Sequence, residues 1–236
     1  MTAFMLKLIA IITMTLDHTS YLVYGHLSWM NFIGRIAFPI FAFQISEGFI
    51  KTHNPQNYAK RLLIFALISQ LPYTWFRILF FNDVELNIIF TLILGLASII
   101  IYNTFSTPKK DISKSIALSY KLIGLMCVLI IALCSQKFNF DYGFYGVFII
   151  FLFYVFHNKK LFMNLSIIAL TFIFYLPNLI ATNFHYKVIL LFLCSLIPLI
   201  FINLYNGKKG KNYKWLFYIF YPVHLLILCL LYYIIH

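Results

Sequence analysis

Long apolar stretches recur along almost the whole 236-residue chain, and they decide what it can fold into. Hydrophobic residues make up 63% of the chain, whereas charged residues make up only 10%. A water-soluble domain of this length has no use for so much apolar surface, but a chain that crosses a bilayer many times needs it. We therefore expect an all-α polytopic membrane protein with a single transmembrane domain over residues 1–236.

The number of spans follows from the length that a helix needs to cross a bilayer, which is about 20 mostly apolar residues. The sequence offers nine candidates, and the sixth of them is short. The nine predicted spans are 5–24, 29–50, 58–80, 86–105, 115–135, 142–157, 161–180, 186–205 and 214–235.

The connections between these spans alternate in their content of Lys and Arg, as they do when the number of spans is right. One side of the membrane receives Lys51, Lys60, Arg61, Lys109, Lys110, Lys114, Lys159, Lys160, Lys208, Lys209, Lys211 and Lys214. The other side receives His26, the acidic "NDVE" of 82–85, Lys137 and Lys187. Because positive loops stay in the cytoplasm, we expect the N-terminus there and the C-terminus outside.

The net charge of +12 has a simple explanation in this topology. The basic residues occur in short clusters between apolar stretches, which favours anionic lipid headgroups over nucleic acid as their partners. The cysteines also lie inside apolar stretches and have no metal-ligand spacing, so we expect free thiols and no metal site. The four are Cys127, Cys134, Cys194 and Cys229.

Charged and titratable side chains inside predicted spans are costly and therefore indicate function. In "KLIAIITMTLDH" of the first span, Lys7 and His18 are eleven residues apart, which is close to three helical turns. They therefore share one face of the helix, with His18 about 16 Å deeper in the membrane. The span carries a cation near the cytoplasm and a titratable base near the middle of the bilayer.

The second span contains a charge that matches this depth. Arg35 lies about six residues from the outer end of an antiparallel neighbour, close to the depth of Asp17 and His18. An ion pair between Asp17 and Arg35 would lower the cost of burying both groups. His18 would then be oriented either by Asp17 or by another neighbour. Pro39 is expected to disturb the helix and free a carbonyl group near Arg35.

The ninth span supplies a second histidine near mid-depth, in "WLFYIFYPVHLLIL". His224 follows Tyr221 by three residues, which adds a hydroxyl group on an adjacent face. A single membrane histidine also serves as a packing residue, and that reading stays open for His224. Glu47 and Asp141 are interpreted as interfacial. The histidines assigned no role are His53, His157, His185 and His236.

Four segments together resemble the TraX family, which is named for the acetylase of F-type conjugation pilin. They are "LKLIAIITMTLDH", "GRIAFPIFAFQISEGF", "DYGFYGV" and "YIFYPVHLLIL". Three of them also resemble the acyltransferase-3 group of membrane acyltransferases. Lys7 and His18 fit the cation-x10-His spacing of that group, and Tyr221 and His224 fit its Tyr-x2-His pattern.

The resemblance implies a membrane acetyltransferase of the bacterial cytoplasmic membrane, with cytoplasmic acetyl-CoA as the acyl donor. On this basis His18 is the catalytic base and Lys7 matches the cationic position, while His224 is a weaker match. The Arg-x-x-Arg of many acyltransferase-3 proteins is absent, and the candidate substitutes near the CoA phosphates are either Lys60 and Arg61 or the "KKGKNYK" loop. The acceptor stays open between a protein amine and the hydroxyl of an envelope glycan.

Acyl transfer needs a base for the acceptor's proton and donors that stabilise the oxyanion. Asp17 is expected to fix the tautomer of His18, as carboxylates do in hydrolytic triads. Arg35 either pairs with Asp17 or faces the oxyanion, and the sequence does not choose. A proton-coupled secondary transporter or flippase also uses buried Asp, His and Arg residues. A structural partner in an envelope complex is a third interpretation.

Overall fold

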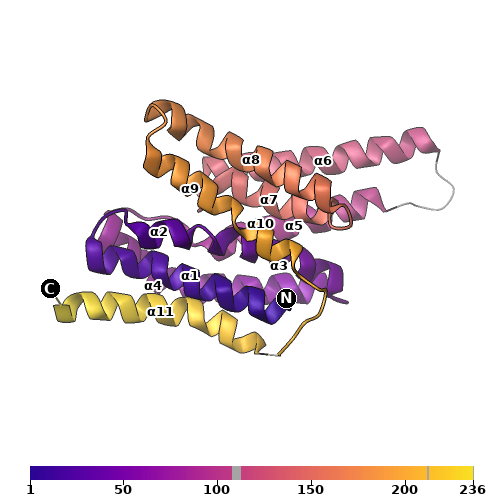
Figure 1. Cartoon of the computed structure of the whole chain (residues 1–236). Coiled ribbons are helices and arrows are strands. Elements are labelled where there is room, and N and C mark those ends of the chain that lie inside the picture. Colours follow the sequence, from indigo (N-terminus) through magenta and orange to yellow (C-terminus); the bar gives the residue numbers. More distant parts are fainter. Residues whose placement is uncertain (108–112, 212, 236) are drawn as a thin grey trace.

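The computed structural model describes residues 1–107, 113–211 and 213–235, and these form a bundle of helices without a β-strand (Figure 1). The helices are α1 (Ala3–Tyr24), α2 (Trp29–Gly34), α3 (Ala37–Lys51), α4 (Pro55–Phe81), α5 (Ile88–Ser106), α6 (Lys114–Lys137), α7 (Gly143–Val155), α8 (Lys160–Ala181), α9 (Tyr186–Leu196), α10 (Pro198–Asn203) and α11 (Lys214–Ile235). The predicted all-α polytopic fold is confirmed.

Each predicted span corresponds to one helix or to two helices in line. The second span is divided into α2 and α3, and the eighth is divided into α9 and α10, where Pro198 begins the second piece. Within the described residues, eight segments are long and apolar enough to cross a membrane. The ninth, α7, has 13 residues.

The short helix α7 is explained by its position inside the bundle. Thirteen residues rise only about 20 Å, whereas a bilayer core is about 30 Å thick. Helix α7 packs against α3, α5, α6 and α8, and its side chains Ile149, Ile150 and Phe153 have no exposed surface. Because protein rather than lipid surrounds it, its length need not match the bilayer.

Polar caps and a glycine set the turn between the first two spans. The Ser28 hydroxyl accepts a hydrogen bond from the Met30 backbone, and Asn31 accepts one from the Ser28 backbone, which together form a capping box at the start of α2. Gly25 ends α1 with a φ of 64°, a left-handed conformation that glycine adopts without strain. The turn is tight, so α1 and α2 lie side by side.

The chain runs back and forth so that the two termini lie at opposite ends of the bundle (Figure 1). One end, here called the basic end, gathers the N-terminus and the C-terminal ends of α3, α5, α7 and α10. Its contacts include the Met1 ammonium group donating to the Leu204 carbonyl at 2.7 Å. Lys109 and Lys110, which the sequence places here, lie outside the described residues.

Glu47, interpreted as interfacial, lies at the basic end of the bundle, but its side chain is buried rather than solvated. Its side chain is only 5% exposed, because Lys51, His157 and Tyr205 surround it at the basic end. The carboxylate lies 2.7 Å from Lys51 Nζ and 2.8 Å from His157 Nε2, and it accepts a hydrogen bond from the Tyr205 hydroxyl at 2.9 Å. Glu47 therefore ties α3 to two connecting loops, and His157 has a structural role.

The sidedness of the bundle gives the first prediction. We expect a periplasmic reporter enzyme fused after residue 235 to be active, and one inserted at 106–114 to be inactive, because Lys-rich loops stay in the cytoplasm. A cytoplasmic reporter should give the opposite pattern at the two sites. The same pattern at both positions would contradict nine crossings.

Candidate functional site

The helix break at Arg35 builds the first part of the site. Helix α2 ends at Gly34 and α3 begins at Ala37, so the chain turns at Arg35 and Ile36. Pro39 lies in the first turn of α3, where its missing N–H group breaks no helical hydrogen bond. A Cβ atom at Gly34 would clash with the Asp17 side chain. The glycine therefore lets α2 approach α1 at the level of Asp17.

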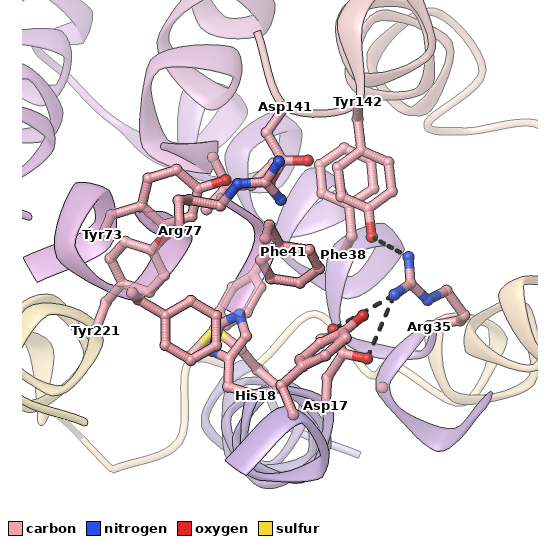
Figure 2. Close-up of a pocket in the computed structure, with 17 residues that line it drawn as sticks. Asp17, His18, Arg35, Phe38, Phe41, Tyr73, Arg77, Asp141, Tyr142 and Tyr221 are labelled. Atoms are coloured by element: carbon pink, nitrogen blue, oxygen red, sulfur yellow. Dashed lines mark hydrogen bonds and ion pairs between the residues drawn. The ribbon is translucent and has the colours of Figure 1, made fainter. Parts of the chain in front are cut away.

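The predicted ion pair between Asp17 and Arg35 is present. Arg35 Nη2 lies 3.3 Å from Asp17 Oδ1 and 3.4 Å from Asp17 Oδ2, and both side chains are mostly buried (Figure 2). The Asn31 side chain donates a further hydrogen bond to Asp17 Oδ1 at 2.9 Å. Arg35 Nη1 donates to the Tyr142 hydroxyl at 3.4 Å. These contacts hold the carboxylate and the guanidinium group in fixed positions.

His18 pairs with His224 rather than with Asp17. The distance from His18 Nδ1 to His224 Nε2 is 2.8 Å, and the two rings stack with centroids 5.1 Å apart. His224 Nδ1 in turn lies 2.9 Å from the carbonyl oxygen of Phe220. The expectation that Asp17 fixes the tautomer of His18 is therefore wrong, because the ion pair and Asn31 hold its carboxylate.

The hydrogen bonds determine where the protons lie when both rings are neutral. A carbonyl oxygen only accepts, so His224 Nδ1 carries its hydrogen and donates to Phe220. His224 Nε2 is then an acceptor, and His18 Nδ1 must donate to it. This leaves the lone pair of the imidazole of His18 on Nε2. A neutral histidine with an available Nε2 is the form of a general base.

His18 and the ion pair face one cavity of about 290 Å³ (Figure 2). Helices α1, α3, α4 and α11 contribute to its wall, together with the connection between α6 and α7. The polar or titratable residues that line it are Asp17, His18, Tyr21, Arg35, Tyr73, Arg77, Asp141, Tyr142 and Tyr221. The cavity lies toward the end of the bundle opposite the basic end.

Sequence reasoning missed or misplaced three lining residues. Arg77 has no role in the sequence analysis, although a charged residue inside an apolar span itself indicates a functional site. Tyr142 lies in the quoted "DYGFYGV" motif. Its ring stacks on that of Phe38, with the ring centroids 3.9 Å apart, and this contact depends on the fold. Asp141, interpreted as interfacial, lines the cavity instead. Burial raises the pKa of the Asp141 carboxyl to about 7, and nearby Glu85 adds to this effect.

The residues expected to bind the CoA phosphates do not line this cavity. Lys7 lies near the basic end, with its Nζ 5.3 Å from the centre of the Phe217 ring. Lys60 and Arg61 lie in the first two turns of α4, also at the basic end, and Arg61 lies over the Tyr58 ring. The structure thus brings together His18, Asp17, Arg35 and His224 and leaves the three cations in a separate region.

Comparison with known proteins identifies the family. Residues 3–232 match the family model described as TraX protein. A probable fimbrial assembly protein FimC, serogroup H1, of Dichelobacter nodosus is 32% identical, and the alignment covers 97% of this chain and 94% of that protein. An uncharacterised protein of Rickettsia prowazekii (strain Madrid E) is 28% identical over 90% of this chain and 83% of its own length. No solved structure matches the chain. The chain therefore belongs to the TraX family.

Proposed function

We propose that this protein transfers an acetyl group from acetyl-CoA to an amine or hydroxyl acceptor at or beyond the membrane. The observation that carries the proposal is the His18–His224 pair, which leaves a lone pair on Nε2 of His18, a residue that lines the cavity. Membership in a family named for pilin acetylation supports the same chemistry. A general base of this kind contributes about 10²–10⁴-fold to a rate.

In the proposed reaction His18 takes a proton from the acceptor while the acceptor attacks the thioester. The positive charge that develops on His18 is stabilised by His224 and, through it, by the Phe220 carbonyl group. Arg35 keeps Asp17 neutralised beside the base. Tyr73 and Tyr221 present side chains to the same cavity, and we assign their hydroxyl groups to the oxyanion.

The acyl donor is assigned to the basic end of the bundle. Lys7, Lys60 and Arg61 supply positive charge for the CoA phosphates there. Lys7 lies about 16 Å from His18 along α1, a distance that the donor's extended arm must cover. Ala10, which lies between the two residues, is fully buried, so the arm must pass beside this face of α1.

The acceptor is assigned to the opposite end, where the cavity lies. The curated relative in Dichelobacter nodosus is a probable fimbrial assembly protein, and the family is named for the acetylation of a pilin. Both favour an exported protein subunit over a glycan. A free amine at the start of such a subunit is the acceptor that we propose first.

The experiment uses the purified full-length protein in lipid nanodiscs with acetyl-CoA and a short synthetic peptide that has a free α-amine. We expect release of the CoA thiol and addition of one acetyl group to the peptide. Lys7→Ala should raise the KM for acetyl-CoA roughly 10- to 100-fold, the loss expected for one charge-assisted contact. Lys187→Ala, at the opposite end, serves as the matched control and should change nothing.

The alternative function predicts a different result in the same assay. A transporter or flippase that uses Asp17, His18 and Arg35 would release no CoA thiol with any acceptor. Thiol release that stays unchanged in Lys7→Ala would refute the proposed donor site while leaving acetyl transfer in place.

A further inference from the structure

The acidic residues of this basic protein are concentrated at the cavity end. The chain has a net charge of +12 and only six Asp and Glu residues. Four of them lie at or beside the cavity. They are Asp17 and Asp141 in its wall, and Asp83 and Glu85 in the neighbouring connection. An isolated bridge between Leu86 and Phe140 holds the two connections together.

Two arginines neutralise only part of this negative charge. Arg35 pairs with Asp17. Arg77 contacts Asp83 and lies 3.1 Å from Glu85. The region therefore has two more carboxylates than guanidinium groups. Within the described part of the chain, Asp141 is the one carboxylate whose oxygens no hydrogen bond or ion pair engages.

We propose that the Asp141 carboxylate binds the acceptor amine in its ammonium form. Asp141 then accepts the first of the two protons that the ammonium group gives up in the reaction. This inference rests on the proposed acetyltransferase function and assigns a residue to the acceptor within it. A cation bound beside Asp141 would supply positive charge that this region lacks. Asp141 and His18 line the same cavity, so one bound amine can lie near both (Figure 2). A neutral hydroxyl acceptor would leave the carboxylate without a partner.

The reaction of an ammonium ion with a thioester needs two proton acceptors. The ammonium group first gives one proton to the Asp141 carboxylate, which frees the nitrogen lone pair. That lone pair attacks the thioester carbonyl, the N–C bond forms, and His18 Nε2 takes the second proton. The C–S bond then breaks, and the CoA thiolate recovers the proton from His18. Asp141 finally releases its proton to water at the cavity mouth.

The pH dependence of acceptor binding follows from the charges around Asp141. The groups of the surrounding elements that face it or act on it are Asp17, His18, Tyr21, Arg35, Tyr73, Arg77, Glu85, Tyr142 and Tyr221. Because the pKa of Asp141 is raised to about 7, the carboxylate is ionised above that pH and neutral below it. The KM for the amine should therefore fall as pH rises through about 7. Asp141→Asn should abolish this fall.

The test compares two peptides that differ at one group, the second having a hydroxyl in place of the α-amine. Binding to the full-length protein in nanodiscs is measured as a rise in Tm, which does not depend on acetyl transfer. We expect the amine peptide to raise the Tm of wild type, and the hydroxyl peptide to raise it far less. Asp141→Asn should weaken amine binding about 10- to 100-fold, as expected for loss of a desolvated charge partner, and Asp141→Glu should restore much of it.

Asp83→Asn is the matched control, since it removes one negative charge from a more exposed position and leaves Glu85 on Arg77. Its effect should be small because solvent screens an exposed charge. Equal binding of both peptides, or an equal loss in Asp83→Asn and Asp141→Asn, would overturn the inference even if acetyl transfer is observed. Amine binding that depends on Asp141 in a protein that transfers no acetyl group would support the ammonium site and refute the proposed function instead.

Discussion

Replacing His18 with alanine should lower the turnover number for acetyl transfer by about 10²–10⁴-fold, because it removes the base that takes the acceptor's proton. The amount of folded protein in the membrane should hold, since the change removes a polar ring from a mostly apolar span. The measurement is the rate of CoA thiol release at saturating acetyl-CoA and acceptor peptide, normalised to folded protein.

His224→Ala separates the base from the residue that orients it. This change removes the acceptor of the His18 Nδ1–H bond but leaves the Nε2 atom of His18 in place, so turnover should fall less than in His18→Ala. The two changes together should cost little more than His18→Ala alone, because residues that act as a unit are not additive. Near wild-type turnover in a folded His18→Ala protein would show that the pair is structural.

Replacing Arg35 with alanine should destabilise the protein by ~3–5 kcal/mol, because it leaves the Asp17 carboxylate without its charge partner. The physical reason is the cost of a charge in a poorly solvated place, which Asn31 alone offsets only in part. The measurement is the Tm of the purified protein, together with its abundance in the membrane.

The double variant tests whether the two charges act on each other. Asp17→Asn combined with Arg35→Gln replaces both charged groups with neutral amides, and the first of the two changes keeps the side-chain shape. Stability should recover in large part relative to Arg35→Ala, while acetyl transfer should stay low. Losses that add fully across the two positions would mean that Asp17 and Arg35 contribute independently.

The helical segments could be predicted from the sequence, because the length of an apolar stretch is a local property. Predicted spans such as 58–80 and 115–135 match Pro55–Phe81 and Lys114–Lys137 within three residues. The interior position of α7 was not accessible, because it depends on the helices that pack around it. For the same reason the burial of Glu47 could not be predicted from the sequence. His157 and Tyr205 contact it from connections more than 100 residues away.

The candidate site could be predicted only in part from the sequence. The depth of charges in antiparallel neighbours was sufficient to predict the Asp17–Arg35 pair. The partner of His18 was not predictable, because His224 lies 206 residues away and its register against α1 is set by tertiary packing. Asp141 lay just outside a span, where an acidic residue is ordinarily solvated, and only the fold turns it into the cavity.

The central claim is that an acetyl group passes from a donor at the basic end to an acceptor at the opposite end, with His18 as the base. It is tested most directly in sealed proteoliposomes that hold the acceptor peptide inside, with labelled acetyl-CoA added outside to protein whose basic end faces outward. The account predicts labelled peptide in the lumen for wild type and at least about 100-fold less for His18→Ala. Absence of lumenal label in wild type, or equal label in both proteins, would contradict it.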